Sequence, residues 1–244
     1  GDGRYPLGET FGDNNAVGPN AQQSLTTGED NNAVGTSAQL SLTTGVNNNA
    51  VGRNAQLSLT EGDNNNAVGR SAQFSLTTGN DNNAVGTSAQ LSLTEGDNNN
   101  AVGRNAQFSL TTGVNNNAVG RDAQYAPAGV TANATTTASR QTSIGHESGQ
   151  GSPTQSNDIT TIGYRAVADG TGATAIGSQA NAAHAGSVAL GDGTTTTATN
   201  QVHVGERDIE IGGTATKGVV MQSPDGTRWR LTVTNAGALD ITAA

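Results

Sequence analysis

Residues 48–62 read NNAVGRNAQLSLTEG, and this stretch decides the fold. The same pattern returns every 17 residues, in phase, seven times along the chain. A fixed period of this length indicates a repeat architecture, in which each repeat is one structural unit that buries its apolar face only by stacking on its neighbours. The recurring valines are Val17, Val34, Val51, Val68, Val85, Val102 and Val119.

Each unit is too short for a helical hairpin, and its Gly, Asn, Thr and Val residues disfavour helix. It has the length of one coil of a β-solenoid, with two short strands separated by turns. Strand alternation predicts that Val51 and Ala55 face inward together, and that Leu57 and Leu59 share a face. Gly62 then opens the polar, Asn-rich turn.

A second array follows, with a period of 14 residues and an apolar residue before glycine in each unit. Ile144-Gly145 is an earlier, irregular member of it. We predict that the apolar residue of every unit belongs to the structural core of the repeats. In the second array these residues are Ile162, Ile176, Leu190 and Val204.

The composition predicts an oligomer that binds neither nucleic acid nor membrane. Apolar residues make up 32% of the chain and aromatic residues 3%, so each coil has a thin core. Three chains around a common axis would bury what one chain leaves exposed, and we predict a homotrimer. A net charge of −9 repels phosphate backbones, and no apolar run approaches the roughly 20 residues of a membrane helix.

Residues 159–205 carry a family resemblance. The segments Ser187–Gly191, reading SVALG, and Ala175–Ala182, reading AIGSQANA, are similar to the repeat of trimeric autotransporter adhesin heads of the YadA type. Asn200–Gly205, reading NQVHVG, resembles the neck entry that closes such heads. The resemblance implies a left-handed parallel β-roll, three chains per head and an adhesive role.

The end of the chain is different. Residues 217–244 read as three strands joined by Pro-Asp-Gly and Asn-Ala-Gly turns, a cap for the last open edge of the array. The segment SPDGTRWRLTV, residues 223–233, resembles the C-terminal ends of bacteriophage tail and virion fibres. Stacking and hydrogen-bonding groups meet at Arg228, Trp229 and Arg230, which we predict as candidate receptor-binding residues.

These features divide the chain into five parts. They are an N-terminal lead-in (1–11), seven 17-residue repeats (12–125), an irregular connection (126–157), the 14-residue array (158–205) and a C-terminal β cap (206–244).

Other repeated side chains have structural interpretations that we prefer to functional ones. The Asn rows that contain Asn48 and Asn49 predict ladders of stacked amides, rather than a sugar-binding or ice-binding surface. The turn acids, such as Asp63 and Asp97, change position too often for a calcium site. Four arginines share one repeat phase and could bind an acidic glycan, pair with acids of neighbouring coils or chains, or simply be solvated: Arg53, Arg70, Arg104 and Arg121.

No catalytic, cofactor or metal site is predicted. His146, His184 and His203 lack ligand spacing, although His203 could lie on a trimer axis. Glu61 and Glu95 share a repeat phase two coils apart, but the sequence offers no apolar pocket that would raise the pKa of a general acid. We therefore expect a structural protein and not an enzyme.

Three functions fit the sequence. The first is a virion fibre, located on a bacteriophage, that binds other virion proteins and a host receptor or glycan. The second is the head of a bacterial trimeric autotransporter adhesin, which would be extracellular on the cell surface. The third is an ice-binding or glycan-degrading solenoid.

Overall fold

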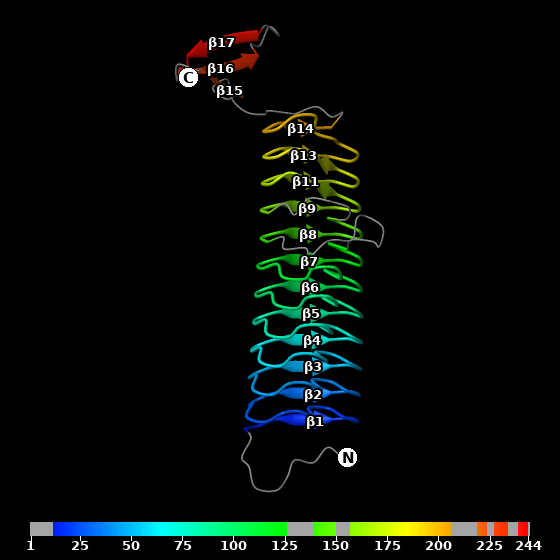
Figure 1. The fold of residues 1–244 in the computed structure, drawn as a ribbon. Coiled ribbons are helices and arrows are strands. Elements are labelled where there is room, and N and C mark those ends of the chain that lie inside the picture. Colours follow the sequence, from blue (N-terminus) through cyan, green and yellow to red (C-terminus); the bar gives the residue numbers. More distant parts are fainter. Residues whose placement is uncertain are drawn as a thin grey trace. The chain divides into compact units, whose positions relative to one another are not determined.

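The computed structural model describes residues 12–125, 139–149, 157–205, 219–223, 227–233 and 239–243. These residues form strands and turns and contain no helix. The chain divides into two compact units, residues 1–205 and residues 206–244. The first is a parallel β-solenoid, which confirms the predicted all-β fold class (Figure 1).

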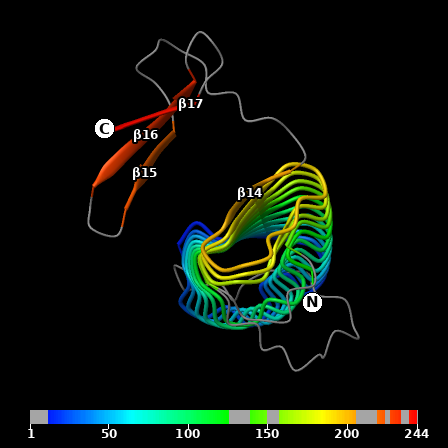
Figure 2. The same cartoon turned by 90° about the horizontal axis from the view of Figure 1, so that it is seen from above.

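One twelve-stranded parallel sheet runs the length of the solenoid. Each coil contributes a three-residue strand, and along the solenoid axis the coils superpose into a flattened ring (Figure 2). In sheet order the strands are β1 (Asn15–Val17), β2 (Asn32–Val34), β3 (Asn49–Val51), β4 (Asn66–Val68), β5 (Asn83–Val85), β6 (Asn100–Val102), β7 (Asn117–Val119), β8 (Thr142–Ile144), β9 (Thr160–Ile162), β11 (Thr174–Ile176), β13 (Val188–Leu190) and β14 (Val202–Val204).

Equivalent residues stack on one another throughout. Asn49, Ala50 and Val51 pair with the same three residue types one coil on, and the same register recurs from β1 to β7. Strand β8 pairs with β7 on one side and β9 on the other. Residues 142–144 therefore form a coil of the solenoid inside the segment that we expected to be an irregular connection.

The second strand of each coil forms only in the 14-residue array. There β10 (Val167–Ala168) and β12 (Asn181–Ala182) pair in parallel as a two-stranded sheet. In the 17-residue array the corresponding Gln-Leu-Ser-Leu segments are turns, so the prediction of two strands per coil is wrong there. The physical reason is a left-handed residue, Gln56 at φ 50° in one coil, which prevents an extended conformation.

Alanine and leucine fill the interior of the solenoid, and valine does not. Ala50, Ala55 and Leu59 are fully buried, as are their equivalents in most coils. In β2 to β7 the central Ala of each Asn-Ala-Val strand is buried while Val is only half-buried on the outer face. The predicted inward orientation of Val51 is therefore wrong.

The error comes from the turn between Val51 and Ala55. Gly52 has φ +141° and Asn54 has φ 58°, so the chain reverses its direction within this segment. Side chains alternate between the two faces only along an extended strand, so the alternation cannot be counted through this turn. A larger residue would also not fit at position 52, because its Cβ would lie 2.5 Å from the carbonyl oxygen of Gly69 in the next coil.

Polar ladders complete the interior. The amide of Gln39 is fully buried and donates to Oε1 of Gln56 at 2.9 Å, and this ladder continues along the array. The ladder ends at Gln107, whose Nε2 has no partner among the described residues, and in the next coil Gln124 donates to Ser143 Oγ at 3.2 Å instead. Buried hydroxyls then continue the chain of bonds, since Ser148 donates to Thr161 and Thr161 to Ser143, both at 2.9 Å.

The second compact unit contains an antiparallel sheet. Its strands are β15 (Val219–Gln222), β16 (Arg228–Val233) and β17 (Leu239–Ala243), with β16 in the centre. The three strands agree with the predicted strand–turn–strand–turn–strand pattern. The residues of the two predicted turns lie outside the described ones.

Substituting two leucines of a single coil tests which side chains lie in the interior of the solenoid. Leu59→Ala removes a fully buried side chain and should cost about 2–5 kcal/mol of unfolding free energy. Leu57→Ala removes a half-buried side chain from the outside of the same coil and should cost clearly less. Chemical denaturation of the two variants measures the difference. Equal losses would contradict the assignment of inner and outer residues.

Candidate functional surfaces

The outer face of the long sheet carries a continuous apolar column. It consists of the third residue of each strand: valine from β1 to β7, then Ile144, Ile162, Ile176, Leu190 and Val204. Several of these side chains are substantially exposed in the single chain, with Ile144 and Ile176 each 39% accessible. The residues predicted as repeat core thus form one surface feature that spans both arrays.

An asparagine ladder lies beside this column. Asn49 Nδ2 donates to Asn66 Oδ1 at 2.6 Å, and the same bond repeats between all neighbours from Asn15 to Asn117. A second, buried ladder is formed by the preceding residue, where Asn48 Nδ2 donates to the Gly62 carbonyl at 2.6 Å. The prediction of amide ladders is confirmed.

The side chains of the turn acids and of one threonine column form hydrogen bonds with backbone groups of neighbouring coils. Asp63 Oδ1 accepts the amide of Val46 and Asp97 Oδ1 that of Asn80, both at 2.8 Å. Each threonine hydroxyl of one column donates to the threonine carbonyl of the next coil, at 2.8–3.1 Å: Thr26, Thr43, Thr60, Thr77 and Thr94. These groups therefore hold neighbouring coils together and are poorly placed to bind calcium or ice.

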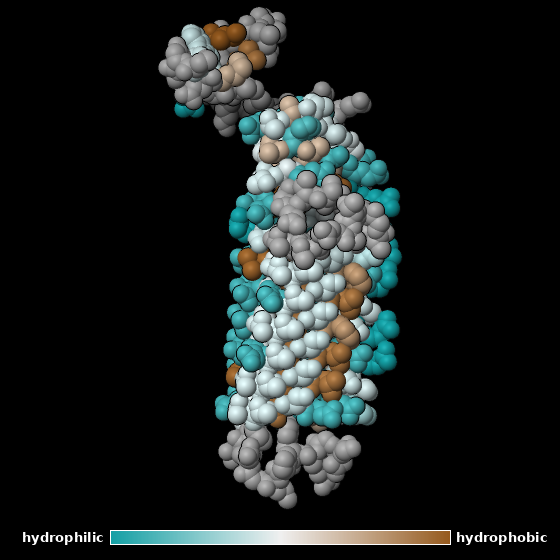
Figure 3. Space-filling model, in the orientation of Figure 1, coloured by the Kyte–Doolittle hydropathy of each residue, from teal (hydrophilic) through white to brown (hydrophobic). Residues whose placement is uncertain are grey.

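A half-buried apolar column is specific to the 17-residue array. Backbone bonds such as Ser58 N–H to the Phe74 carbonyl stack its members from coil to coil: Leu40, Leu57, Phe74, Leu91 and Phe108. The rings of Phe108 and Tyr125 meet edge to face, with centroids 5.3 Å apart. Figure 3 shows hydrophobic side chains along one side of this array.

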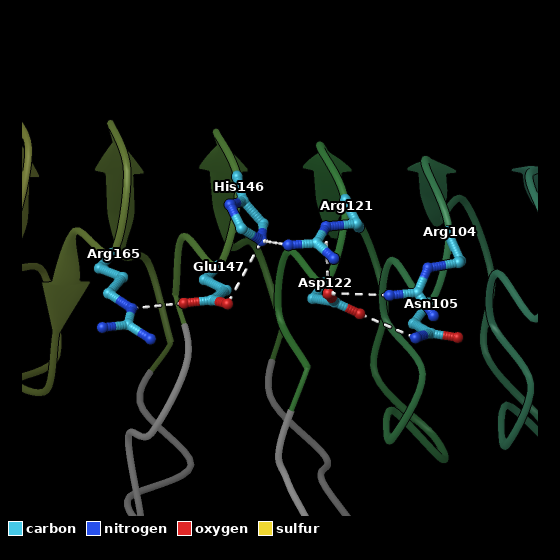
Figure 4. A network of polar contacts seen from close by, with 7 residues as sticks. All are labelled: Arg104, Asn105, Arg121, Asp122, His146, Glu147 and Arg165. Carbon is cyan, nitrogen blue, oxygen red and sulfur yellow. Dashed lines mark hydrogen bonds and ion pairs between the residues drawn. The ribbon is translucent and has the colours of Figure 1, made fainter.

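The four arginines that share one repeat position fall into two groups. Arg53 and Arg70 are exposed and have no ion-pair partner among the described residues. Arg104 and Arg121 lie 3.6 and 3.5 Å from Asp122 Oδ2, and Asn105 donates to Asp122 Oδ1 at 2.8 Å (Figure 4). Pairing with an acid of a neighbouring coil, one of the predicted roles, is confirmed for Arg104, whereas Arg121 pairs with the next residue of its own coil.

This network continues across the junction of the two arrays (Figure 4). The guanidinium group of Arg121 contacts His146 Nε2, which lies 3.3 Å from Glu147 Oε1. Glu147 in turn accepts a hydrogen bond from Arg165, whose guanidinium carbon lies 5.3 Å from the centre of the Tyr164 ring. The network thus spans four successive coils where the repeat sequence changes, with ion pairs between the first two coils and between the last two, and the Arg121–His146 contact between the middle two.

Sequence reasoning missed this network. Its members occupy the two positions after the repeat glycines Gly103, Gly120, Gly145 and Gly163. This shared position in the repeat is the sequence feature that could have predicted the network. The intervening insertions change the spacing from 17 to 25 and then 18 residues, which hid the alignment of these positions.

Asp122, His146 and Glu147 offer three possible metal ligands within 4.8 Å of one another. The side chains of Arg104, Arg121 and Arg165 contact the same carboxylates or the imidazole. Two carboxylates against three guanidinium groups leave a positive local charge, which repels a divalent cation. We therefore assign the cluster to ion pairing between coils.

Two carboxyl groups near the junction have lowered pKa values. The hydrogen bond from Arg165 is the main cause of the lowered pKa of Glu147, and the one from Arg140 lowers the pKa of Asp158. Arg140 Nε donates to Asp158 Oδ1 at 2.5 Å. Both pairs join adjacent coils.

The remaining predicted residues do not gather into a site. Glu61 and Glu95 are exposed on the solenoid surface. His184 Nδ1 lies 3.4 Å from Thr196 Oγ1, and His203 Nδ1 lies 2.6 Å from the Thr195 carbonyl. His203 pairs in register with the buried Ala189, which places it on the inner side of the sheet and away from the apolar column.

In the second unit, Arg228, Trp229 and Arg230 are consecutive in β16. Arg228 and Trp229 have exposed side chains, and Trp229 is 40% accessible. Because neighbouring residues of a strand project to opposite faces, Arg228 and Trp229 do not form one binding surface. Their role as a receptor-binding site remains a prediction.

The described part of the chain contains no helix that could cross a membrane.

Comparison with known families identifies the 14-residue array. The YadA head domain repeat matches twice, over residues 162–180 and 168–194. The matched residues include β10 to β13, so the predicted resemblance is confirmed for this part of the solenoid. No curated protein matches the chain in sequence. The resemblance of residues 223–233 to virion fibres stays a prediction.

The Arg165–Glu147 pair predicts a pH-dependent stability. A carboxyl with a lowered folded pKa stabilises the protein above its unfolded pKa and loses this effect as the pH falls through the folded value. Glu147→Gln should therefore unfold at lower denaturant concentration than the parent at neutral pH, and this difference should shrink in acid as the pH falls through the lowered folded pKa of Glu147.

Glu61→Gln is the matched control, since it removes the same charge from an exposed residue that has no ion pair in the described structure. It should show little difference from the parent at neutral pH or in acid. A Glu147→Gln effect that persists unchanged in acid would rule out the ion pair as its cause.

Proposed function

We propose that this chain is the head segment of a trimeric adhesive fibre, displayed outside a bacterial cell. The observation that carries the proposal is the apolar column on the outer face of the sheet, which continues without interruption through the residues that match the YadA head repeat. Among the described residues, this column is the apolar surface that both arrays share.

Physical chemistry supports association through this face. Soluble monomers rarely expose long contiguous apolar surfaces, and such surfaces mark interfaces. The polar neighbours of the column already bond to one another, as Asn49 does to Asn66. Removing that ladder from water therefore costs less than burying free amides. Three copies that face a common axis would bury the whole column.

The adhesin hypothesis has better support than the virion hypothesis. The matched family is that of an adhesin head, and its repeats lie in the solenoid itself. A location on the cell surface or in the extracellular space follows from the same similarity. The virion-fibre hypothesis depends on the short C-terminal segment, residues 223–233, for which the comparisons give no support.

The geometry also favours a binding or spacer role over an enzymatic one. The Thr hydroxyls that an ice-binding face would need donate to backbone carbonyls of the next coil. Glu61 and Glu95 are exposed to water. Neither carboxyl therefore has the apolar surroundings that a general acid needs. A polymer-degrading function has no supporting observation in the described residues.

Adhesion is tested with the protein on a surface. Beads coated with the full chain should be retained on cultured epithelial cells or extracellular matrix under flow, whereas beads coated with the acid-unfolded chain should not. Soluble chain added in excess should release them. Retention no greater than that of uncoated beads on any host surface would overturn the adhesive function while leaving the architecture intact.

The trimer is tested by mass. Light scattering should give three times the chain mass of 24.4 kDa. Ile176→Lys introduces charges into the apolar column and should shift the protein towards the monomer. Gln179→Lys alters an exposed turn residue of the same coil and should leave the trimer intact. A monomer mass for the unmodified chain would contradict the proposed assembly.

A further inference from the structure

In the three-stranded sheet of the second unit, apolar and polar residues lie in different cross-strand rows. Strand pairing places Met221, Trp229 and Ala243 in one row across the sheet, and Val219, Leu231 and Ile241 in another. A further row pairs Val233 with Leu239. Every residue of these three rows is apolar.

The rows in between have a different character. They pair Gln222 with Arg228, Thr232 with Asp240, and Arg230 with Thr242 and Val220. Successive rows of an antiparallel sheet alternate between its two faces. The sheet therefore has one face whose register positions are all apolar, and another that is mainly polar.

The described residues leave several side chains of the apolar face exposed. The side chains of Met221, Trp229 and Ile241 are 48%, 40% and 60% accessible. A sheet that is apolar on one face is stable in water when that face is buried against another element. The chain's single Trp and single Met lie together on this face, paired in register.

We infer that this face packs against the same face of two further copies of the chain, so that three sheets form a common apolar core in the C-terminal unit. This inference deepens the proposed trimer and rests on it. In this arrangement Trp229 is a core residue of the assembly rather than part of a receptor-binding surface.

The size of the face favours copies of the chain over a separate partner protein. Three strands about 4.8 Å apart and about 20 Å long offer a face of roughly 300 Å². A stable complex of free proteins buries about 800 Å² per partner. The face is therefore too small to hold an independent protein by itself.

Tethering removes this difficulty for copies of the same chain. Once the solenoids have associated, the three C-terminal sheets are held at a high effective concentration, and a small interface is then sufficient. The polar residue Arg228 lies on the other face of the sheet and would stay in water.

Trp229 reports directly on the inference, because the chain has no other tryptophan. In the full trimeric chain its fluorescence should be several-fold less quenched by acrylamide than that of free N-acetyltryptophanamide. Ile241→Lys should restore quenching several-fold while the mass by light scattering stays that of a trimer. Arg228→Ser, on the polar face, should change neither quantity.

A cross-link keeps the test valid if Ile241→Lys merely unfolds the sheet. The chain has no cysteine, so Met221→Cys introduces a single thiol at the apolar face. Mild oxidation should then produce covalent dimers on a non-reducing gel. Arg228→Cys places the thiol on the opposite face and should give few.

The outcomes separate this inference from the trimer on which it rests. A trimeric mass with fully quenchable Trp229 and no Met221→Cys cross-link would overturn the shared core and leave the trimeric solenoid standing. Equal cross-linking of Met221→Cys and Arg228→Cys would also overturn it. A monomeric mass would remove both proposals, and a protected Trp229 in a monomer would show that the chain covers the face itself.

Discussion

In-register stacking of each coil on an equivalent coil is the constraint on which the structure depends. Parallel pairing sets every residue beside its own equivalent, as Val51 beside Val34 and Val68. Each side chain must therefore be compatible with a copy of itself at about 4.8 Å. Amides, hydroxyls and small apolar groups satisfy this condition, because they can bond or pack to themselves.

This constraint explains how the perimeter of the coil is divided. Ala50 and Leu59 stack into a dry interior, and Gln39 and Asn48 can be buried because each donates to a group in the next coil. Charged side chains repel their own equivalents and stay outside. Glycine occupies the tightest turn, where Gly52 lies against the backbone of Gly69.

The junction of the two arrays shows what happens when neighbouring coils differ. Serine and threonine hydroxyls replace the alanine rows inside, and they bond to one another across the coils. Outside, acids and arginines alternate and pair from coil to coil, as Glu147 does with Arg165. Unlike neighbours are here held by complementary groups, where identical neighbours are held by ladders.

The sequence was sufficient to predict the solenoid, because the period and the composition of the unit allow few other folds. It also predicted the asparagine ladders, since an amide that recurs in phase has a partner at the coil spacing. It did not predict which face valine occupies. That depends on the left-handed conformations of Gly52, Asn54 and Gln56, and two of these three residues are not glycine.

The candidate surfaces were predictable only in part. The shared phase of Arg104 and Arg121 was visible, but their partner Asp122 is an acid at a repeat position that the other 17-residue coils fill with Asn or Ser. The C-terminal strands were predicted, whereas the separation of Arg228 and Trp229 onto two faces follows from strand alternation, which a search for a binding cluster overlooked.

The mass per unit length of the particle in solution tests the central claim most directly. Small-angle X-ray scattering of the full chain yields this quantity from the cross-section of an elongated particle. Side-by-side association through the apolar column predicts three coils of chain for every rise of about 4.8 Å. One coil per rise, whether from single chains or from solenoids joined end to end, would contradict it.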